Sequence, residues 1–170
     1  MAELAANTAL LGFAFLMLMA AWTDLAKFTI PNWIPGVMIA LWLAAAPLVS
    51  PSWASAGLSL AVFAGVLALG LALWAPGWLG GGDVKLLAAG ALWFGWPDAA
   101  TFLLYACASG GVLALILIVA RRLSPALPVS AEALGKTALA QGAPAPYAVA
   151  IAAGALVVLP QSAVFAAYSG

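Results

Sequence analysis

Residues 99–120 read AATFLLYACASGGVLALILIVA, a stretch without a single charged side chain. A transmembrane helix needs ~17–25 mostly apolar residues to cross a hydrocarbon core of ~30 Å, and this stretch is long enough. The whole chain has the same character, because 67% of its 170 residues are hydrophobic and only 6% are charged. A typical soluble domain has about 25% charged residues. The sequence therefore predicts an integral membrane protein built from helices.

Six apolar segments are separated by glycine, proline and polar residues. In chain order they are 4–22, 33–49, 56–74, 84–96, 99–120 and 145–168. We expect an all-α, polytopic membrane helix bundle of about six transmembrane helices, forming a single membrane-embedded domain over residues 1–170. The segment 84–96 is the shortest, so it either spans a thinned bilayer, starts deep in the bundle or is re-entrant. The connector 121–144 is predicted to be irregular, with a short helix around 131–139.

The composition excludes several classes of function. The net charge is zero, which gives no support for nucleic-acid binding. Cys107 is the only cysteine and there is no histidine, so an internal disulfide, Ser-His-Asp catalysis and Cys-His catalysis are all excluded. A structural zinc site needs about four ligands of these kinds. We therefore expect no structural metal site.

The basic residues predict the orientation in the membrane. In a six-span topology all five lie in or beside the loops of one side, and they are Lys27, Lys85, Arg121, Arg122 and Lys136. Basic residues are enriched on the cytoplasmic side, so the N-terminus is expected to lie outside. Six tryptophans close to the expected helix ends match an aromatic belt, and they are Trp22, Trp33, Trp53, Trp74, Trp78 and Trp96.

Two aspartates are predicted to meet on the cytoplasmic side. Asp24 follows the first apolar segment and Asp83 precedes the fourth, so an even number of crossings returns the chain to the same face. Two close carboxylates cannot both ionise cheaply, so one keeps a proton. The ionised one can take a proton from water while the protonated one binds the scissile carbonyl. Asp24 and Asp83 are therefore the candidate catalytic residues of an aspartic protease.

Residues beside the aspartates are candidates for substrate binding. The glycines 80–82 permit positive φ angles and close backbone approach, so an extended substrate strand can lie against them. The alternative is a flexible hinge with Asp83 as the helix N-cap. Lys27 can pair with Asp24 if the first helix continues, and Lys85 either snorkels to the surface or binds an acidic substrate side chain. The candidates are Gly80, Gly81, Gly82, Lys85 and Lys27.

Two motifs resemble those of the type IV prepilin peptidases, membrane proteases of the Gly-x-Gly-Asp type. That family has an aspartate followed by Ile-Pro-Asn, which matches DLAKFTIPN at 24–32, and a Gly-x-Gly-Asp that opens a helix, which matches GGGDVKLLAA at 80–89. The segment PAPYA at 144–148 is similar to the family's entrance to the last helix. The likeness is greatest to the minimal form that serves tight-adherence pili.

The resemblance implies a function. Such enzymes remove a short basic leader from a prepilin or pseudopilin at the cytoplasmic face of the bacterial inner membrane, cutting after a glycine and before the apolar pilin helix. It implies that Asp24 and Asp83 are the catalytic pair, that no cofactor is needed, and that the partners are the pilin, the lipid bilayer and the pilus-assembly machinery. Larger members carry a four-cysteine zinc domain between the first two spans, where this chain has about eight residues. Methyltransferase activity is therefore not expected.

Two other functions remain open at this point. A presenilin-like intramembrane protease also uses Gly-x-Gly-Asp, but cuts within the bilayer. A non-catalytic pilus-assembly scaffold or small carrier would use the two acids as proton or ion ligands.

Overall fold

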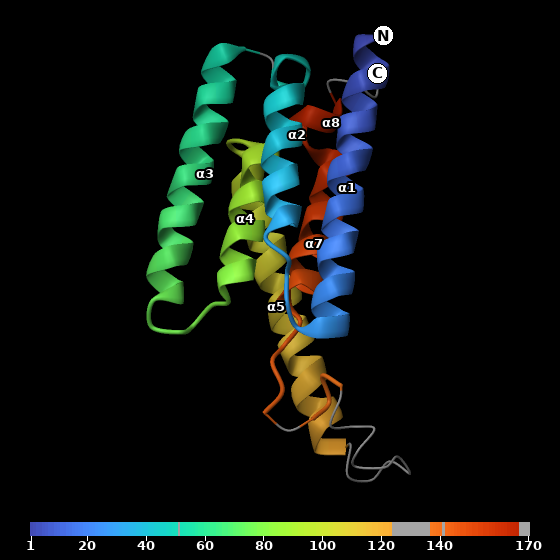
Figure 1. The fold of residues 1–170 in the computed structure, drawn as a ribbon, viewed down its shortest axis with the longest axis vertical. Helices are drawn as coiled ribbons and strands as arrows, with labels where there is room; N and C mark the ends of the chain where they lie inside the picture. The colour runs from blue at the N-terminus through green and yellow to red at the C-terminus, as the bar shows by residue number, and fades with distance from the viewer. Residues whose placement is uncertain (51, 124–136, 141, 167–170) are drawn as a thin grey trace.

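The computed structural model describes residues 1–170 except 51, 124–136, 141 and 167–170. Within the described residues every regular element is a helix, which confirms the all-α prediction. The helices, labelled as in Figure 1, are α1 Ala2–Lys27, α2 Trp33–Val49, α3 Trp53–Trp74, α4 Gly81–Phe94, α5 Asp98–Leu123, α7 Tyr147–Val158 and α8 Ala163–Ala166, with the 3₁₀ turn η2 at Leu159–Gln161. The helices α1, α3 and α5 are long and apolar enough to cross a membrane.

Two expected boundaries are wrong, and one expected helix lies mostly outside the described residues. The first helix runs on to Lys27, so five residues, 28–32, join it to α2 instead of about eight. The segment expected at 145–168 is a continuous α-helix only from Tyr147 to Val158, where the turn η2, which contains Pro160, separates it from the short helix α8. Proline has no N–H to give to the preceding turn, so it interrupts an α-helix. Residues 131–136 of the expected connector helix lie outside the described residues, and 137–140 form turns and bends.

The short helix α4 is the centre of the bundle. It packs against α2, α3, α5 and α7, and nearly all its residues from Asp83 to Phe94 are buried. Its 14 residues rise only ~21 Å. The segment is therefore a short helix enclosed by its neighbours, and its first turn lies at the lower end of the bundle (Figure 1).

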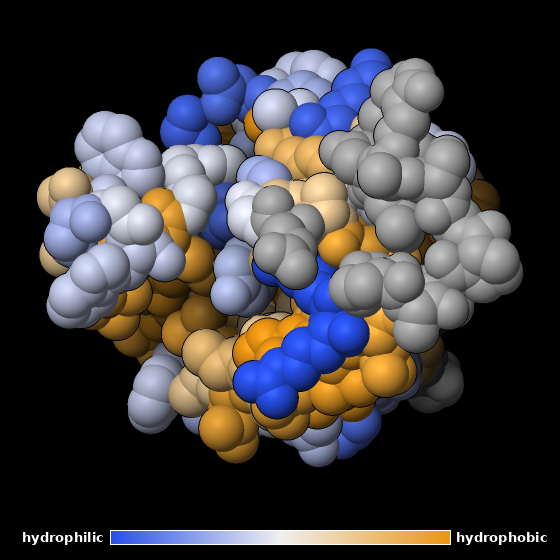
Figure 2. Space-filling model, turned by 90° about the horizontal axis from the view of Figure 1, so that it is seen from below, coloured by the Kyte–Doolittle hydropathy of each residue, from blue (hydrophilic) through white to orange (hydrophobic). Residues whose placement is uncertain are grey.

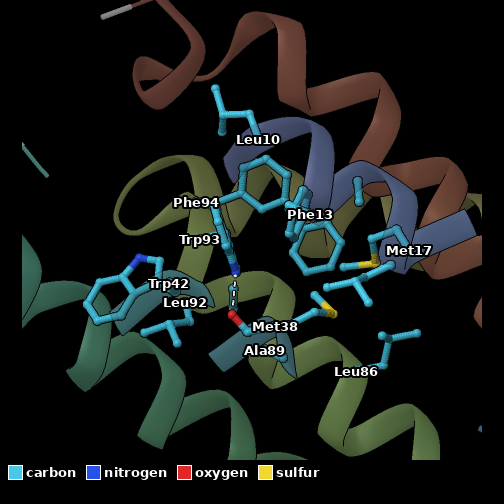
Figure 3. Close-up of a cluster of buried hydrophobic side chains, with 14 of the residues drawn as sticks. Leu10, Phe13, Met17, Met38, Trp42, Leu86, Ala89, Leu92, Trp93 and Phe94 are labelled. Carbon is cyan, nitrogen blue, oxygen red and sulfur yellow. Dashed lines mark hydrogen bonds between the residues drawn. The ribbon is translucent and has the colours of Figure 1, made fainter. Parts of the chain in front are cut away.

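An aromatic cluster fixes α4 against α1 and α5. The ring centroids of Phe13 and Trp93 are 5.1 Å apart, and Phe94 stacks on Phe102 at 5.0 Å. Aromatic pairs at this spacing contribute ~0.5–1.5 kcal/mol beyond the area they bury. The indole N–H of Trp93 donates to the carbonyl of Met38 at 3.1 Å, so the one polar atom of this ring is satisfied (Figure 3).

The aspartates lie at one end of the bundle, opposite the start of α1 and the short helix α8. The last turn of α1 and the first turn of α4 are both at the lower end in Figure 1. Seen from below, hydrophilic residues gather at this end among hydrophobic helix surfaces (Figure 2). Lys27, Lys85 and the Arg121–Arg122 pair belong to the helix ends on this side, whereas Lys136 is outside the described residues. All six tryptophans expected in the aromatic belt are exposed, while Trp42 and Trp93 are buried.

The contact between α5 and α7 depends on Gly154. A Cβ atom at Gly154 would lie 2.6 Å from the backbone nitrogen of Ala106, so a side chain there must push the two helices apart. We expect Gly154→Ala to destabilise the protein by ~1–3 kcal/mol, the usual cost of overpacking. Gly65→Ala is the matched control, because a Cβ there would touch nothing within 4 Å. The stability of both variants is measured by thermal unfolding in detergent. Equal unfolding midpoints for the two variants would contradict this packing.

Candidate functional site

Asp24 lies in the last turn of α1, immediately before a sharp turn. The backbone N–H of Phe28 donates to the carbonyl oxygen of Asp24 at 2.8 Å, and Phe28 itself has φ 52° and ψ 33°. A residue with a side chain rarely adopts this left-handed conformation, which is normally taken by glycine at the end of a helix. The turn reverses the chain over residues 28–32 and leaves the Asp24 side chain buried in the bundle.

Asp83 is the third residue of α4, and its N-cap is Gly80. The alternative in which Asp83 is itself the N-cap is therefore wrong by three positions. The Asp83 carboxylate instead accepts a hydrogen bond from the backbone N–H of Gly80. This is half of a capping box, in which the acidic residue at the third helical position reaches back to the N-cap.

The two carboxylates share one pocket. Asp24 and Asp83 both line a cavity of about 260 Å³, together with the turn residues Phe28, Thr29 and Ile30 and the glycines 80–82. They are close enough for the negative charge of Asp24 to repel that of Asp83. Both side chains are almost fully buried. The prediction that the two acids meet on one side of the bundle is thus confirmed as geometry.

The N-terminus of α7 completes the surroundings of Asp24. The backbone N–H of Ala148 donates to Oδ2 of Asp24 at 2.9 Å. Ala148 is the second residue of α7, and the N–H groups of a first turn have no partner within their own helix. Each aspartate therefore receives an N–H from the start of a helix, α7 for Asp24 and α4 for Asp83, where the helix dipole favours a negative charge.

Two contacts hold the α1–α2 turn on the first turns of α4. A Cβ atom at Gly82 would lie 3.1 Å from Cβ of Ile30, so the turn packs directly on a backbone without a side chain. The ammonium group of Lys85 donates to Oδ1 of Asn32 at 2.8 Å. Because Asp24 precedes this turn and Asp83 precedes Lys85, these contacts set the position of one carboxylate relative to the other.

Arg121 ties the end of α5 to the segment that leads into α7. Its guanidinium donates to the carbonyl of Ala138 at 3.0 Å and to that of Ala143 at 2.7 Å. Pro146, the N-cap of α7, follows three residues after Ala143. The arginine thus supports the backbone from which Ala148 reaches Asp24.

The sequence profile of the type IV leader peptidase family matches residues 11–115, which is more than half of the chain. The chain belongs to the type IV leader peptidase family. The matched range begins in α1, ends in α5 and includes both aspartates of the pocket. No curated protein and no solved structure is significantly similar to the chain. Family membership makes the protein a peptidase, and the apolar helices make it a membrane protein.

Of the other predicted site residues, the three glycines line the pocket and the two lysines do not. Gly80–Gly82 line the pocket, but none has a positive φ angle, so their value is the space they leave and not conformational freedom. Lys27 is exposed and makes no ion pair with Asp24, although the helix does continue past Asp24 as that pairing required. Lys85 donates to Oδ1 of Asn32. Its contact with a substrate, like that of Lys27, stays a prediction.

Sequence reasoning gave no role to Phe28, Thr29, Asn32 or the N–H of Ala148. One signal was present, because the family-like segment 144–148 ends on the residue that binds Asp24. Among the described residues, no three Cys, Asp or Glu side chains lie together as a metal site would require. The pocket therefore offers two neighbouring carboxylates beside an open space.

Gly80 and Gly81 provide a matched pair of variants. A Cβ atom at Gly80 would lie 2.5 Å from Oδ2 of Asp83, so Gly80→Ala must rotate that carboxylate out of place. At Gly81 the nearest atom would be Nε1 of Trp74 at 3.4 Å, an ordinary contact. We expect Gly80→Ala to lower kcat/KM about 100-fold, the typical effect of a ~1 Å misplacement, and Gly81→Ala to change it less than about threefold. Peptide-cleavage kinetics test this pair, and similar losses in both variants would contradict it.

Proposed function

We propose that the protein is an aspartic endopeptidase that removes the short basic leader of type IV, Flp-like prepilins at the cytoplasmic face of the inner membrane. The observation that supports this most is the pocket shared by Asp24 and Asp83. The pocket lies at the end of the bundle where the described basic residues gather, which is the cytoplasmic end if the positive-inside rule applies. A leader carrying positive charge would be attracted to the two carboxylates.

The proposed reaction needs one proton shared by the pair. The anionic carboxylate takes a proton from a water molecule, whose oxygen attacks the scissile carbonyl carbon. The neutral carboxyl donates its proton to the carbonyl oxygen, giving a tetrahedral diol. When the C–N bond breaks, the leaving nitrogen takes a proton from the carboxyl that began as the anion and had accepted the proton of the water. A hydroxyl of the diol returns its proton to the carboxylate that had donated one, so the pair regains its starting state. The products are the leader with a new carboxyl end and the pilin with a new amino end.

The proposed activity stops at cleavage. The α1–α2 connection consists of residues 28–32 only, which leaves no room there for a domain of the kind that accompanies methylation in larger members. We therefore expect the purified protein to leave the new pilin N-terminus unmethylated in the presence of S-adenosylmethionine. A methylated product from the pure protein would contradict this part of the proposal.

Either Asp24→Asn or Asp83→Asn should abolish leader removal, because an amide can neither take the proton from water nor share one with its partner. General acid–base groups typically raise a rate about 10²–10⁴-fold, so the cleavage rate should fall by at least that factor. The assay is co-expression with a prepilin from the same genome, followed by mass spectrometry of the pilin N-terminus.

Asp98→Asn is the matched control. Asp98 starts α5 at the opposite end of the bundle, where its Oδ2 accepts from the backbone N–H of Ala163 at 2.7 Å. This variant should process the prepilin normally. Leader removal by either Asp24→Asn or Asp83→Asn would contradict the proposed catalytic pair. A cut inside the apolar helix would favour the presenilin-like alternative. Proton-coupled uptake in proteoliposomes without any cleavage would favour the carrier.

A further inference from the structure

A second cavity lies beside the aspartate pocket, between α5, α7 and the N-terminal part of α4. Its volume is about 300 Å³. Along α5 it is lined by residues three to four positions apart, which form one face of the helix over ~12 Å, and these residues are Ala106, Cys107, Gly110, Gly111 and Ala114. We call this cavity the α5 groove. It carries no charged side chain.

The α5 groove and the aspartate pocket are continuous along the chain. Leu79 lines the groove, and the next residue, Gly80, lines the aspartate pocket. Tyr147 lines the groove as well, and the next residue, Ala148, donates its N–H to Asp24. The groove therefore comes within one residue of the aspartate pocket at Leu79, and within one residue of the contact to Asp24 at Tyr147.

The lining favours a helix as the occupant. Lipid tails are as apolar as leucine, so helices associate in membranes where small residues let their backbones approach. The groove face of α5 consists of glycine, alanine and cysteine, whereas the opposite face exposes Val112, Ile116 and Val119. Large branched side chains on that face suit contact with lipid. The groove face instead leaves room for another backbone.

We propose that the α5 groove binds the apolar helix of the substrate, immediately on the C-terminal side of the scissile bond. This inference rests on the proposed leader-peptidase reaction, because a cut directly before an apolar helix requires that helix to lie next to the aspartates. The groove would then position the cleavage site, since the helix binds along α5 while the leader extends over Asp24 and Asp83.

Gly111→Leu tests the groove directly. A Cβ atom at Gly111 would touch nothing within 4 Å, so a leucine can fill the groove without disturbing the packing of the protein itself. The probes are two designed peptides with the same basic leader and glycine, one followed by an apolar helix of about 20 residues and one ending shortly after the cleavage site. We expect Gly111→Leu to lower kcat/KM about tenfold, or ~1.4 kcal/mol, for the helix-bearing peptide only. Gly65→Leu on α3, another position with open space, is the control and should leave both rates unchanged.

Cross-linking gives a second test that does not depend on a substituted groove. Cys107 is the only cysteine of the chain, is exposed and lines the groove. In the Asp83→Asn background, which holds the peptide uncut, a cysteine placed in the first two turns of the substrate helix should form a disulfide with Cys107. The control moves the thiol to the lipid-facing side of α5 with Cys107→Ala and Val112→Cys, where no disulfide should form.

Three results would overturn the groove assignment. These are equal cleavage of the helix-bearing peptide by Gly111→Leu and the unchanged protein, cross-linking at position 112 but not at 107, or Cys107–Cys107 dimers without any substrate adduct. The last result would assign the groove to a second copy of the chain. If Gly111→Leu lowers the thermal midpoint, the cross-linking result alone decides. Cleavage by Asp83→Asn would instead defeat the proposed function, so the two failures are distinguishable.

Discussion

The close approach of Ile30 to Gly82 is the constraint on which the site depends. At Gly82 a Cβ atom would lie 3.1 Å from Cβ of Ile30, so any side chain there would require the α1–α2 turn to shift by a few tenths of an ångström from the first turn of α4. The bond from Lys85 to Asn32 fixes the same two segments one turn further along. Through these contacts two aspartates that are far apart in sequence come to line one cavity. Tight packing of this kind transmits small displacements, because interiors have little free volume to absorb them.

The surroundings of the pair balance two opposing effects. Each carboxylate accepts a backbone N–H from the start of a helix, which stabilises its negative charge. Burial and the repulsion between the two charges oppose a doubly ionised pair. A single shared proton satisfies both requirements, and it is also the state that the proposed hydrolysis needs. The buried core of α4 keeps this arrangement rigid, since Trp93 and Phe94 anchor the far end of the helix against α1 and α5.

Much of the fold and part of the site could be predicted from the sequence, and there are physical reasons why the other contacts of the site could not. Apolar runs identified every long helix, and the even number of crossings placed Asp24 and Asp83 at one end. The contact of Ala148 with Asp24 could not be derived from the residues, because Ala148 lies 124 residues away and acts through its backbone N–H; only the family-like segment 144–148 pointed to this region. The glycine motif was explained by positive φ angles and by the close approach of a substrate strand, whereas the structure shows no positive φ there and places Ile30 and the Asp83 carboxylate against these glycines. Lys85 was considered alone because nothing in its local spacing indicates Asn32.

The most direct measurement of whether Asp24 and Asp83 act as one unit is a double-mutant cycle on leader cleavage. Rates are compared for Asp24→Asn, Asp83→Asn and the protein carrying both substitutions, with thermal unfolding confirming that each is folded. Groups that share a proton lose their function together, so the double variant should be no slower than either single variant. Losses that multiply in the double variant, or substantial activity in one of the single variants, would show that the two carboxylates work independently and would contradict the shared-proton mechanism.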